Sequence, residues 1–567
     1  MYSRFFYITF RGILVSMTTL MMYASSMLYA QVQLDWTPRA DINIMLPPSV
    51  RVFETSSDLS SGRRIRAYYA LIQPNVELRS LDLAPNAIPQ SVAGGNAVLA
   101  VNGGYFTTPS GSVPSGSVSL IVKDGQRIAR QIASLSRRGA SGTNTTFFPT
   151  RSAFGIGSDG TKTVGWTYDI GNDIYRYTSP SPNREGSDPQ QQPTALFPTA
   201  GILWRPQMAI GGGPMLVYNG QRTITTEVEL FPADIPPPNP RTAIGYRQDG
   251  TTIIVVVDGR RPGISDGCDL PELADIMLGL QCVGAINLDG GGSSVIATAD
   301  QAISIPSNTG FVQRAVASAI TAQVQGFTPP QTFIYDKSSS TYRETGTWTS
   351  APASAGPFWR NTPARVTENT GNATASFRFA GLPTGQYQVG VWWSVDNSRA
   401  GNVPITLSGG VNRTFTVNQS DVATMNKWNI LGTFSLSAND SLVISNRVNI
   451  GTISADAVRL IPTSATSVRR FDNRIAQSIS LWSVSPNPVE RGSAPAYISF
   501  ALTSDQQVSV YITDMLGRIV ARPTDNQFLQ RGEHTITWSP QVSSGLYIVT
   551  IYTADGMYSQ KIIVRGS

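Results

Sequence analysis

The sequence predicts a mostly β protein of several domains: an α+β region with mixed sheets, followed by two small β-sandwich domains. Its 567 residues exceed the roughly 250 to 300 residues at which a single hydrophobic core stops growing. With 51 glycines, 37 prolines and only 14% charged residues, the composition is typical of strands joined by turns. In the second half of the chain, short runs alternate between apolar and polar residues, as half-buried strands do.

The first region, residues 31–326, combines strands with at least one helix. β-branched residues predict strands over Ala97–Val101, Val118–Val122 and Ile253–Val257. A helix is expected over Leu270–Leu280, because one face would carry Leu270, Leu273, Ala274, Met277 and Leu278. Two proline-rich loops, Tyr175–Pro198 and Pro232–Pro240, could help to shape a nearby site.

The second and third regions, residues 332–462 and 471–567, follow linkers at Phe327–Gln331 and Thr463–Arg474. In the second region, alternation predicts strands at Ala375–Phe379 and Tyr387–Trp393. In the third region it predicts strands at Val508–Ile512, Tyr547–Ile551 and Ile562–Val564. Each region should therefore form a small β-sandwich.

The first 30 residues predict a signal peptide. Arg4 and Arg11 precede the apolar run Gly12–Leu20, small residues follow, and no acid occurs before Asp35. A permanent anchor is the alternative, but the run is short for a membrane span. Cleavage after Ala30 would export a mature chain without a transmembrane segment, and it would lower the formal net charge from +6 to +4 because two arginines are lost. Such a small charge gives no argument for nucleic acid binding.

Histidine and cysteine are scarce. The one histidine, His534, lies far from every glycine-rich motif, which disfavours a Ser-His-Asp triad, a Cys-His pair and a histidine-ligated zinc site. The two cysteines, Cys268 and Cys282, flank the expected helix. Separate buried thiols are at least as plausible as a disulfide, since the helix could hold the sulfurs too far apart. Any chemistry therefore depends on carboxylates, arginines, amides and hydroxyls.

Five glycine-rich or charged motifs in the first region follow or contain apolar runs. They are NGGYF (Asn102–Phe106), GGGPML (Gly211–Leu216), PRTAIG (Pro240–Gly245), VVVDGR (Val255–Arg260) and NLDGGGSS (Asn287–Ser294). Alone, each reads as an ordinary turn. Together they predict that several strand ends converge on one anion-binding cavity.

These motifs, with DGCDLPELADIMLGL (Asp266–Leu280) and FVQRAV (Phe311–Val316), resemble the phosphodiester glycosidase family over most of residues 65–325. That family includes enzymes that remove N-acetylglucosamine from a phosphodiester. The resemblance implies a secreted hydrolase that cleaves a sugar-1-phosphodiester in a glycoconjugate or a surface polysaccharide. N-acetylglucosamine is one candidate sugar.

The resemblance and the chemistry of the reaction select candidate site residues. An oxocarbenium-like transition state needs a carboxylate, for which Asp289 is the first choice and Asp258 and Glu272 are candidate partners. Turn capping is the plain alternative for Asp258, as is the first turn of a helix for Glu272. The remaining candidates for substrate and phosphate binding are Arg241, Thr242, Asn102, Gly212, Gly213, Arg260, Gly290, Gly291, Gly292, Ser293 and Arg314. Salt bridges, Asx turns and caps are their structural alternatives.

The second region resembles the golvesin C-terminal domain, associated with xanthan lyase, through TGTWTS (Thr345–Ser350), LPTGQYQVGVWW (Leu382–Trp393), KWNILGTF (Lys427–Phe434) and ADAVRL (Ala455–Leu460). That resemblance implies carbohydrate binding. Its candidate stacking residues are Trp348, Trp359, Trp392 and Trp393. Because alternating tryptophans usually belong to a core, we expect binding only from an exposed one, such as Trp359.

The third region resembles the sorting domain of type IX secretion cargo through SPNP (Ser485–Pro488), YITDMLGR (Tyr511–Arg518), SSGLYIV (Ser543–Val549) and KIIV (Lys561–Val564). It implies the type IX machinery as a partner and a location at or beyond the cell surface. The competing functions are a non-catalytic carbohydrate-binding adhesin on an enzyme scaffold and a hydrolase that processes exopolysaccharide or peptidoglycan. The sequence implies no definite cofactor, and it leaves open whether a carboxylate-rich pocket binds calcium or magnesium.

Overall fold

The computed structural model describes residues 34–108, 116–232, 238–448, 450–463, 479–492, 495–514, 519–553 and 556–566. The chain divides into two compact units, Met1–Ser464 and Ala465–Ser567. The predicted signal peptide lies outside the described residues. The predicted fold class, an α+β region followed by β-rich domains, is confirmed. In one respect the first region differs from the expectation: its described strand pairs are antiparallel, whereas mixed sheets were predicted.

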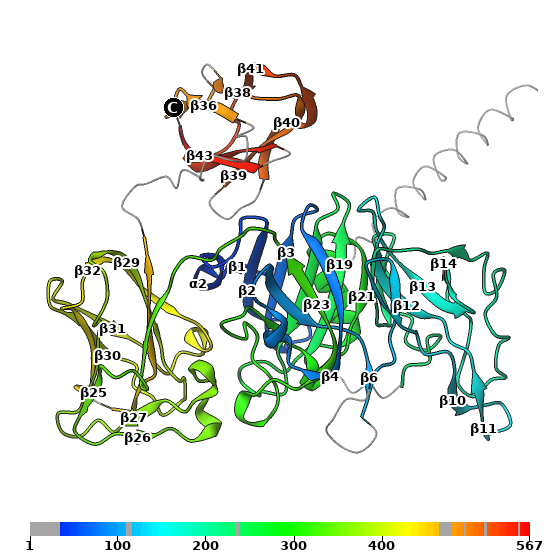
Figure 1. Ribbon diagram of the computed structural model, residues 1–567, viewed down its shortest axis with the longest axis horizontal. Coiled ribbons are helices and arrows are strands. Elements are labelled where there is room, and N and C mark those ends of the chain that lie inside the picture. The colour runs from blue at the N-terminus through cyan, green and yellow to red at the C-terminus, as the bar shows by residue number, and fades with distance from the viewer. Residues whose placement is uncertain are drawn as a thin grey trace, which may run out of the picture. The chain divides into compact units, whose positions relative to one another are not determined.

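An eight-stranded sheet is the frame of the first region. Its strands, in spatial order, are β1 (Thr37–Pro38), β2 (Val50–Asp58), β3 (Arg64–Ile72), β20 (Thr252–Val257), β19 (Arg241–Arg247), β21 (Cys282–Asn287), β17 (Met215–Tyr218) and β18 (Gln221–Arg222). The early strand β3 thus pairs with β20, which forms about 180 residues later in the chain, and Figure 1 shows blue β2 and β3 in the same sheet as green β19 and β21.

Two further sheets complete the first region. The seven-stranded sheet contains β15 (Ile202–Leu203), β14 (Asp173–Tyr177), β13 (Lys162–Ile170), β12 (Arg151–Ile156), β16 (Met208–Gly211), β8 (Ile121–Lys123) and β9 (Gln126–Ala129). The four-stranded sheet contains β22 (Ile296–Ala297), β5 (Ala97–Asn102), β23 (Val316–Gln323) and β4 (Glu77–Ala87). Two hairpins pair β10 (Leu135–Arg138) with β11 (Asn144–Phe147), and β6 (Phe106–Thr107) with β7 (Gly116–Ser117).

The eight-stranded sheet has a hydrophobic core on each of its two faces, and alternate side chains of its strands enter one core or the other. In β20, Ile253, Val255 and Val257 pack with helix α3 (Leu270–Gly279). Ile254 and Val256 belong instead to the core shared with the other two sheets. A β-strand directs alternate side chains to opposite faces, so a continuous apolar run fits a strand between two cores.

The expected strands and helix form with small differences. The helix ends at Gly279, and Ile276 is buried on its inner face, whereas Leu278 is only half-buried. The strand expected at Val118–Val122 shortens to β8, because side chains take the place of a strand neighbour. Ser119 Oγ accepts a hydrogen bond from the Tyr105 amide at 2.9 Å, and Gln131 Oε1 accepts one from the Leu120 amide at 2.9 Å.

The second region is a sandwich within the first unit. One sheet contains β24 (Phe333–Asp336), β35 (Ala457–Pro462), β29 (Gly385–Trp392) and β32 (Asn429–Leu436); the other contains β25 (Tyr342–Thr345), β28 (Thr374–Arg378), β33 (Ser441–Ser445), β30 (Val403–Ser408) and β31 (Arg413–Val417). A small sheet adds β26 (Thr349–Ser350), β27 (Arg365–Thr367) and β34 (Ile453–Ala455). One core joins the two larger sheets, and it includes Ile305 and Phe311 of the first region.

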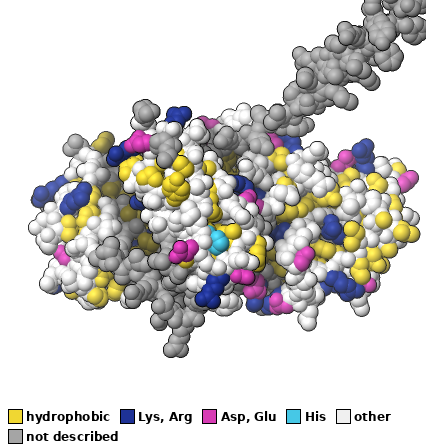
Figure 2. All heavy atoms as spheres, turned by 90° about the horizontal axis from the view of Figure 1, so that it is seen from above, with side chains coloured by type: hydrophobic (Ala, Val, Ile, Leu, Met, Phe, Trp, Pro, Cys, Tyr) yellow, Lys and Arg dark blue, Asp and Glu magenta, His cyan; other side chains and the backbone are white. Residues whose placement is uncertain are grey.

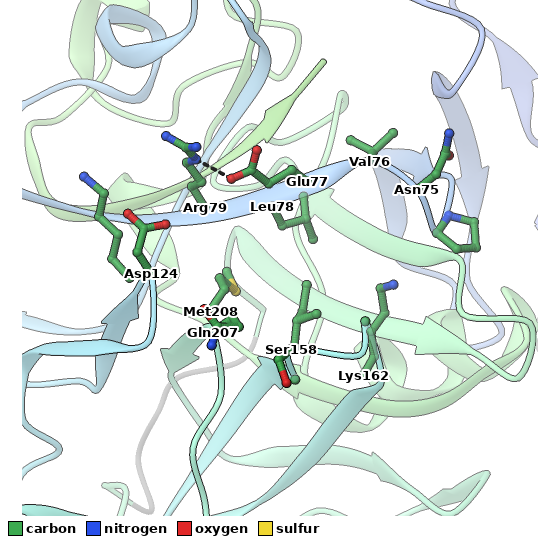
Figure 3. A pocket seen from close by; sticks show the side chains of 15 residues that line it. Asn75, Val76, Glu77, Leu78, Arg79, Asp124, Ser158, Lys162, Gln207 and Met208 are labelled. Atoms are coloured by element: carbon green, nitrogen blue, oxygen red, sulfur yellow. Dashed lines mark hydrogen bonds and ion pairs between the residues drawn. The ribbon is translucent and has the colours of Figure 1, made fainter. Parts of the chain in front are cut away.

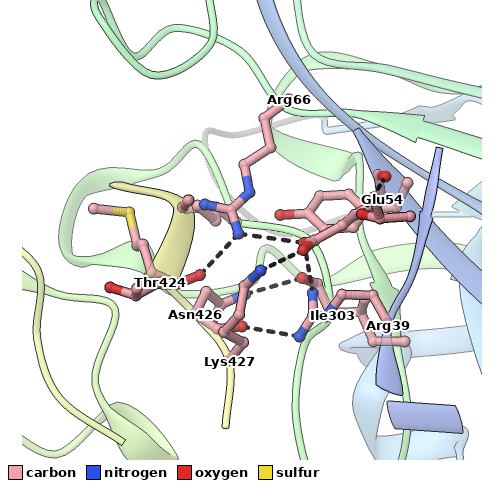
Figure 4. A network of polar contacts seen from close by, with 12 residues as sticks. Arg39, Glu54, Arg66, Ile303, Thr424, Asn426 and Lys427 are labelled. Carbon is pink, nitrogen blue, oxygen red and sulfur yellow. Dashed lines mark hydrogen bonds and ion pairs between the residues drawn. The ribbon is translucent and has the colours of Figure 1, made fainter. Parts of the chain in front are cut away.

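A buried ionic network joins the second region to the first (Figure 4). Glu54 accepts from Lys427 and lies 3.5 Å from both Arg39 Nη1 and Arg66 Nη2. Burial and the three cations oppose each other at Glu54, and the net effect lowers the pKa of its carboxyl. Asn426 adds bonds from its Nδ2 to the carbonyls of residues 302, 303 and 304. The segment after β22 is thus held by the second region.

The second unit is also built from two sheets around one core. They contain β36 (Ile479–Ser485), β38 (Ala496–Leu502) and β41 (Gly532–Trp538), and β37 (Val489–Glu490), β43 (Gly556–Arg565), β42 (Gly545–Thr553), β39 (Gln506–Asp514) and β40 (Ile519–Leu529). On the molecular face drawn in Figure 2, basic and acidic side chains are interspersed among uncharged ones.

Candidate functional site

Asp289 follows the last residues of β21 and has a tightly fixed backbone. Its amide donates to Gly103 O at 3.2 Å, and its carbonyl accepts from Asn102 Nδ2 at 2.7 Å. The side chain is 16% exposed. Burial raises the pKa of the carboxyl to about 6, while Ser293, Arg314 and the Gly290 amide act in the opposite direction. The carboxylate is therefore desolvated but retains access to a ligand.

Asn102 and Thr242 tie three of the predicted motifs together. Asn102, at the end of β5, is fully buried, and its Oδ1 accepts from Thr242 Oγ1 at 2.9 Å and from the Val295 amide at 3.2 Å. With the bond to the Asp289 carbonyl, its side-chain amide is engaged on both sides. This geometry favours the role of ligand positioner over that of direct substrate donor for Asn102 and Thr242.

Three arginines surround the glycine triplet beside Asp289. A methyl group built on Gly290 would lie 4.0 Å from Arg241 Nη1, one on Gly291 would lie 2.9 Å from Arg260 Nη2, and one on Gly292 would lie 3.5 Å from Arg314 Nη1. At Gly291 a β-carbon would collide with Arg260, so glycine is what allows this guanidinium group to approach the backbone. The distances to the arginines at Gly290 and Gly292 are ordinary van der Waals contacts. Gly291 also has a φ of 60°, which favours glycine.

Each arginine is anchored by a different contact. Arg241 is 4% exposed, and its Nε donates to Cys268 O at 3.0 Å. Arg260 donates from Nε and Nη2 to Asn239 Oδ1 at 3.1 and 3.0 Å. Arg314 donates to Ser293 Oγ and lies 3.5 Å from Asp289 Oδ2. Ser293 therefore links Arg314 to the catalytic candidate.

The Gly212 and Gly213 amides are used inside the protein. Gly212 N donates to Ser152 O at 2.9 Å and Gly213 N to Asn287 O at 2.7 Å. In the triplet, Gly290 N donates to Asp289 Oδ1 at 2.9 Å and Gly291 N to Pro240 O at 2.8 Å. This arrangement does not favour the expected phosphate contacts from these four amides, and it leaves Arg241, Arg260 and Arg314 as the candidate anion-binding groups.

Comparison with known proteins identifies the three regions in the expected order. Residues 95–322 match the sequence model of the phosphodiester glycosidase family, residues 333–462 that of the golvesin C-terminal domain, and residues 483–565 that of the secretion system C-terminal sorting domain. The first region is similar to phosphodiester glycosidases over these residues and is named the glycosidase domain. The three predicted resemblances are confirmed, and the sorting domain marks the protein for type IX secretion to the cell surface or the extracellular space.

Individual relatives are distant. The SPbeta prophage-derived uncharacterized protein YomE of Bacillus subtilis (strain 168) is 39% identical over 16% of this chain and 13% of its own length. N-acetylglucosamine-1-phosphodiester alpha-N-acetylglucosaminidase of Bos taurus is 24% identical over 48% of this chain and 46% of its own length. The chain thus spans less than half of either curated relative. The catalytic domain of the zebrafish enzyme of that name, auto-inhibited by its pro-peptide, aligns at 19% identity with a TM-score of 0.35, over 52% of this chain and 89% of its own.

Asp258 and Glu272 are not brought to the glycine triplet of the glycosidase domain. Asp258 accepts from Tyr68 Oη at 3.2 Å and from the Ile305 amide at 2.9 Å, and burial raises its pKa to about 7 against the effect of Arg66. Glu272 forms a capping box with Asp269 at the start of α3 and pairs with Arg63 at 2.8 Å. The geometry supports structural roles for both carboxylates. For Glu272 this role is the one in the first turn of a helix, which the sequence offered as the alternative to catalysis.

Tyr105 was not among the predicted site residues, although it lies within the NGGYF motif. Its hydroxyl donates to Gly213 O at 2.8 Å and accepts from Asn287 Nδ2 at 2.8 Å. Burial raises the pKa of the phenol, and the negative charge of Asp289 raises it further. Tyr105 is therefore a neutral neighbour of Asp289. Its position as the first aromatic residue after the glycine pair was the available sequence signal.

Glu229 is a second carboxylate that motif reasoning did not select. It is fully buried and accepts from the Ser152 amide at 2.8 Å, Trp166 Nε1 at 3.1 Å and the Met215 amide at 3.0 Å. The Ser152 and Thr225 hydroxyls also donate to it. These bonds satisfy the buried carboxylate within the protein and tie β12, β13 and β17 together.

Two hollows of the glycosidase domain differ in their relation to the site. A cleft of about 820 Å³ is lined by Arg241, together with Glu185, Ile224, Thr226, Glu227, Leu230, Phe231, Asp269, Leu270 and Pro271. The hollow in Figure 3 is lined by residues such as Glu77, Arg79, Lys123, Asp124 and Lys162, and by none of the predicted site residues. Its Arg79 and Glu77 pair at 2.6 Å. Of these two hollows, only the cleft is lined by one of the three arginines around the glycine triplet, Arg241.

The two cysteines do not form a disulfide. Cys268 and Cys282 are free buried thiols in one core, and burial raises the pKa of Cys282 to about 12. Within the described ranges, no group of three or more His, Cys, Asp or Glu side chains gathers as a metal site would require. No helix among the described residues is long and apolar enough to cross a membrane.

The tryptophans of the golvesin-type domain are buried, so the expectation of an exposed Trp359 was wrong. Trp348, Trp359, Trp392 and Trp393 are 7%, 3%, 2% and 2% exposed. Trp359, Trp392 and Trp428 pack on one another, with ring centroids 4.6 to 5.5 Å apart. Mutual packing of aromatic rings stabilises a core, and this packing explains why Trp359 is not available on the surface.

Proposed function

We propose that the glycosidase domain hydrolyses a sugar-1-phosphodiester in a glycoconjugate or surface polysaccharide outside the cell. The observation that carries the proposal is the approach of Arg241, Arg260 and Arg314 to the triplet Gly290–Gly292 beside the buried carboxylate of Asp289. N-acetylglucosamine is the first sugar to test, because the bovine relative is named for it.

The arginines would act on the phosphate. A phosphodiester carries one negative charge, and guanidinium groups bind such anions through paired, charge-assisted hydrogen bonds. When the bond between the anomeric carbon and oxygen breaks, the leaving group gains a second charge as a phosphomonoester. Preorganised cations stabilise that charge more in the transition state than in the substrate. A phosphate leaving group is a weak base, so the reaction depends less on a general acid than ordinary glycoside hydrolysis does.

Asp289 would act on the sugar. With a pKa of about 6, its carboxyl is mostly ionised at pH 7 and can stabilise positive charge at the anomeric carbon. Water supplies a hydroxyl to that carbon and a proton to the phosphomonoester, so the products are the free sugar and a phosphomonoester. Tyr105 hydrogen-bonds Asn287 and Gly213 O and would keep the strand ends in place around the carboxylate.

The test is release of free sugar from a panel of sugar-1-phosphodiesters. Asp289→Asn should reduce kcat by about 10²-fold or more, and Arg241→Ala should reduce kcat/KM by about 10- to 150-fold, the range of one charged hydrogen bond. Arg205→Ala is the matched control, because Arg205 is 74% exposed and pairs with Asp173. Full turnover by Asp289→Asn would remove Asp289 from catalysis. Retained saccharide binding without turnover by the wild type would favour the adhesin alternative.

A further inference from the structure

The cleft lined by Arg241 has a mostly apolar wall. Its apolar lining residues are Ile224, Leu230, Phe231, Leu270 and Pro271. Its volume of about 820 Å³ lies in the upper part of the range of roughly 300 to 1,000 Å³ for small-molecule pockets. Covering such walls with an apolar ligand is favourable because it removes apolar surface from water. A second sugar ring would instead place hydroxyl groups against walls that offer them no hydrogen-bond partners.

Two residues connect the cleft to the site around Asp289. Arg241 lines the cleft, and its Nη1 atom would lie 4.0 Å from a β-carbon built on Gly290. Phe231 also lines the cleft and packs on Tyr105 with ring centroids 5.3 Å apart. A phosphate bound by Arg241 beside Gly290 would therefore have the cleft next to it. One ester substituent of that phosphate is the sugar, which Asp289 faces, and the other is the alcohol.

The charges on the cleft favour a neutral occupant. Three acidic residues, Glu185, Glu227 and Asp269, line it, and Arg241 is the one basic residue among its described lining. Arg184 pairs with Glu227 at 2.9 Å and Arg63 pairs with Asp269 at 2.7 Å. These two carboxylates therefore already have cationic partners and do not require a cationic ligand. An additional negative charge on the alcohol would still meet these carboxylates and be disfavoured.

We propose that this cleft, named the aglycone cleft, binds the alcohol portion of the substrate and selects an uncharged, largely apolar alcohol with an alkyl or aryl body. The inference rests on the proposed function and narrows its substrate class. Arg241 holds the single negative charge of the phosphodiester. The apolar wall then contributes affinity in proportion to the apolar surface of the alcohol that it covers.

The test compares N-acetylglucosamine-1-phosphodiesters that differ only in the alcohol: methyl, butyl, octyl, benzyl and 2-carboxyethyl. If another sugar is released more efficiently from the first panel, the series is made with that sugar. Each methylene that becomes buried should raise kcat/KM roughly fourfold, so the octyl ester should exceed the methyl ester by at least tenfold. The 2-carboxyethyl ester should be cleaved more slowly than the butyl ester.

Ile224→Ser is the diagnostic variant, because Ile224 is only half-buried, lines the cleft and is not one of the residues proposed to bind the phosphate. It should lower the octyl-to-methyl ratio several-fold. That ratio is independent of how much enzyme is correctly folded. Ile202→Ser is the control, since Ile202 is 51% exposed and lies outside the cleft, and it should keep the wild-type ratio.

The outcomes separate the two proposals. Turnover of every ester at equal kcat/KM, or a faster methyl than octyl ester, would overturn the aglycone cleft and leave the proposed function intact. An unchanged octyl-to-methyl ratio in Ile224→Ser would also overturn it. If the wild type releases no sugar from any phosphodiester, the proposed function itself fails.

Discussion

Asp289→Asn should stabilise the protein as well as inactivate it. Burial raises the pKa of Asp289 from an ordinary 3.8 to about 6, so the folded state prefers the neutral carboxyl. At 1.36 kcal/mol for each pH unit, ionisation of Asp289 in the folded protein costs about 3 kcal/mol. The attraction of Arg314 is already included in this raised pKa. Replacing the ionised carboxyl by the neutral asparagine side chain should therefore gain about 3 kcal/mol at neutral pH.

The sign of the pH dependence is fixed by linkage. Between pH 3.8 and about 6 the folded wild type binds more protons than the unfolded chain, so its stability falls as the pH rises through this window. The asparagine variant has no such group. Its advantage should be absent near pH 4, should grow up to about pH 6, and should be constant at higher pH. The same ionisation should make wild-type kcat/KM fall about tenfold per pH unit below about pH 6.

Urea unfolding at several pH values measures this difference. Tryptophan fluorescence reports mainly the first unit, because eight of the ten tryptophans precede residue 465. Asp159→Asn is a control of opposite sign: Asp159 is exposed, and the Thr161 hydroxyl and amide lower its pKa, so this variant should lose stability at neutral pH. A stability difference for Asp289→Asn that does not change between pH 4 and pH 7 would refute the reasoning.

Two further substitutions test structural assignments. Glu272→Ala removes the capping box of α3 and should lower stability by about 1 kcal/mol while kcat stays at the wild-type value; a large loss of kcat with normal stability would return Glu272 to the catalytic set. Glu54→Ala leaves Arg39, Arg66 and Lys427 without their shared carboxylate and should cost about 3 to 5 kcal/mol in urea unfolding, whereas exposed Glu77→Ala should cost little.

The sequence patterns were most informative where one physical signal decided the structure. Alternating or continuous apolar runs predicted β5 and β20 nearly to the residue, and a one-sided apolar face predicted α3. They failed at Val118–Leu120, where the Ser119 and Gln131 side chains replace strand neighbours. They also could not reveal the contact between Glu54 and Lys427, because ion pairs between residues 373 positions apart leave no local pattern.

Asp258 shows why a motif alone does not define a site. It follows an apolar strand and precedes a glycine, as does Asp289 after β21. Pairing register separates the two: Arg241 lies opposite Val257, and adjacent side chains along a strand point to opposite faces. Asp258 is therefore directed away from Arg241, toward Tyr68 and Ile305. Only the strand pairing, which the sequence does not contain, distinguishes these carboxylates.

The polar residues of the motifs divide by whether their bonding capacity is already used within the protein. Asn102 and Thr242 are fully buried and bonded to the protein, so substitutions there would disturb folding and activity together. Arg260 and Arg314 reach solvent while they approach the glycine triplet, and an anion can still bind to them. Arg314 offsets the desolvation of Asp289 only in part, because Arg314 is 40% exposed and the pKa of the carboxyl stays raised. In the proposed reaction, positive charge at the anomeric carbon would stabilise the carboxylate further in the transition state.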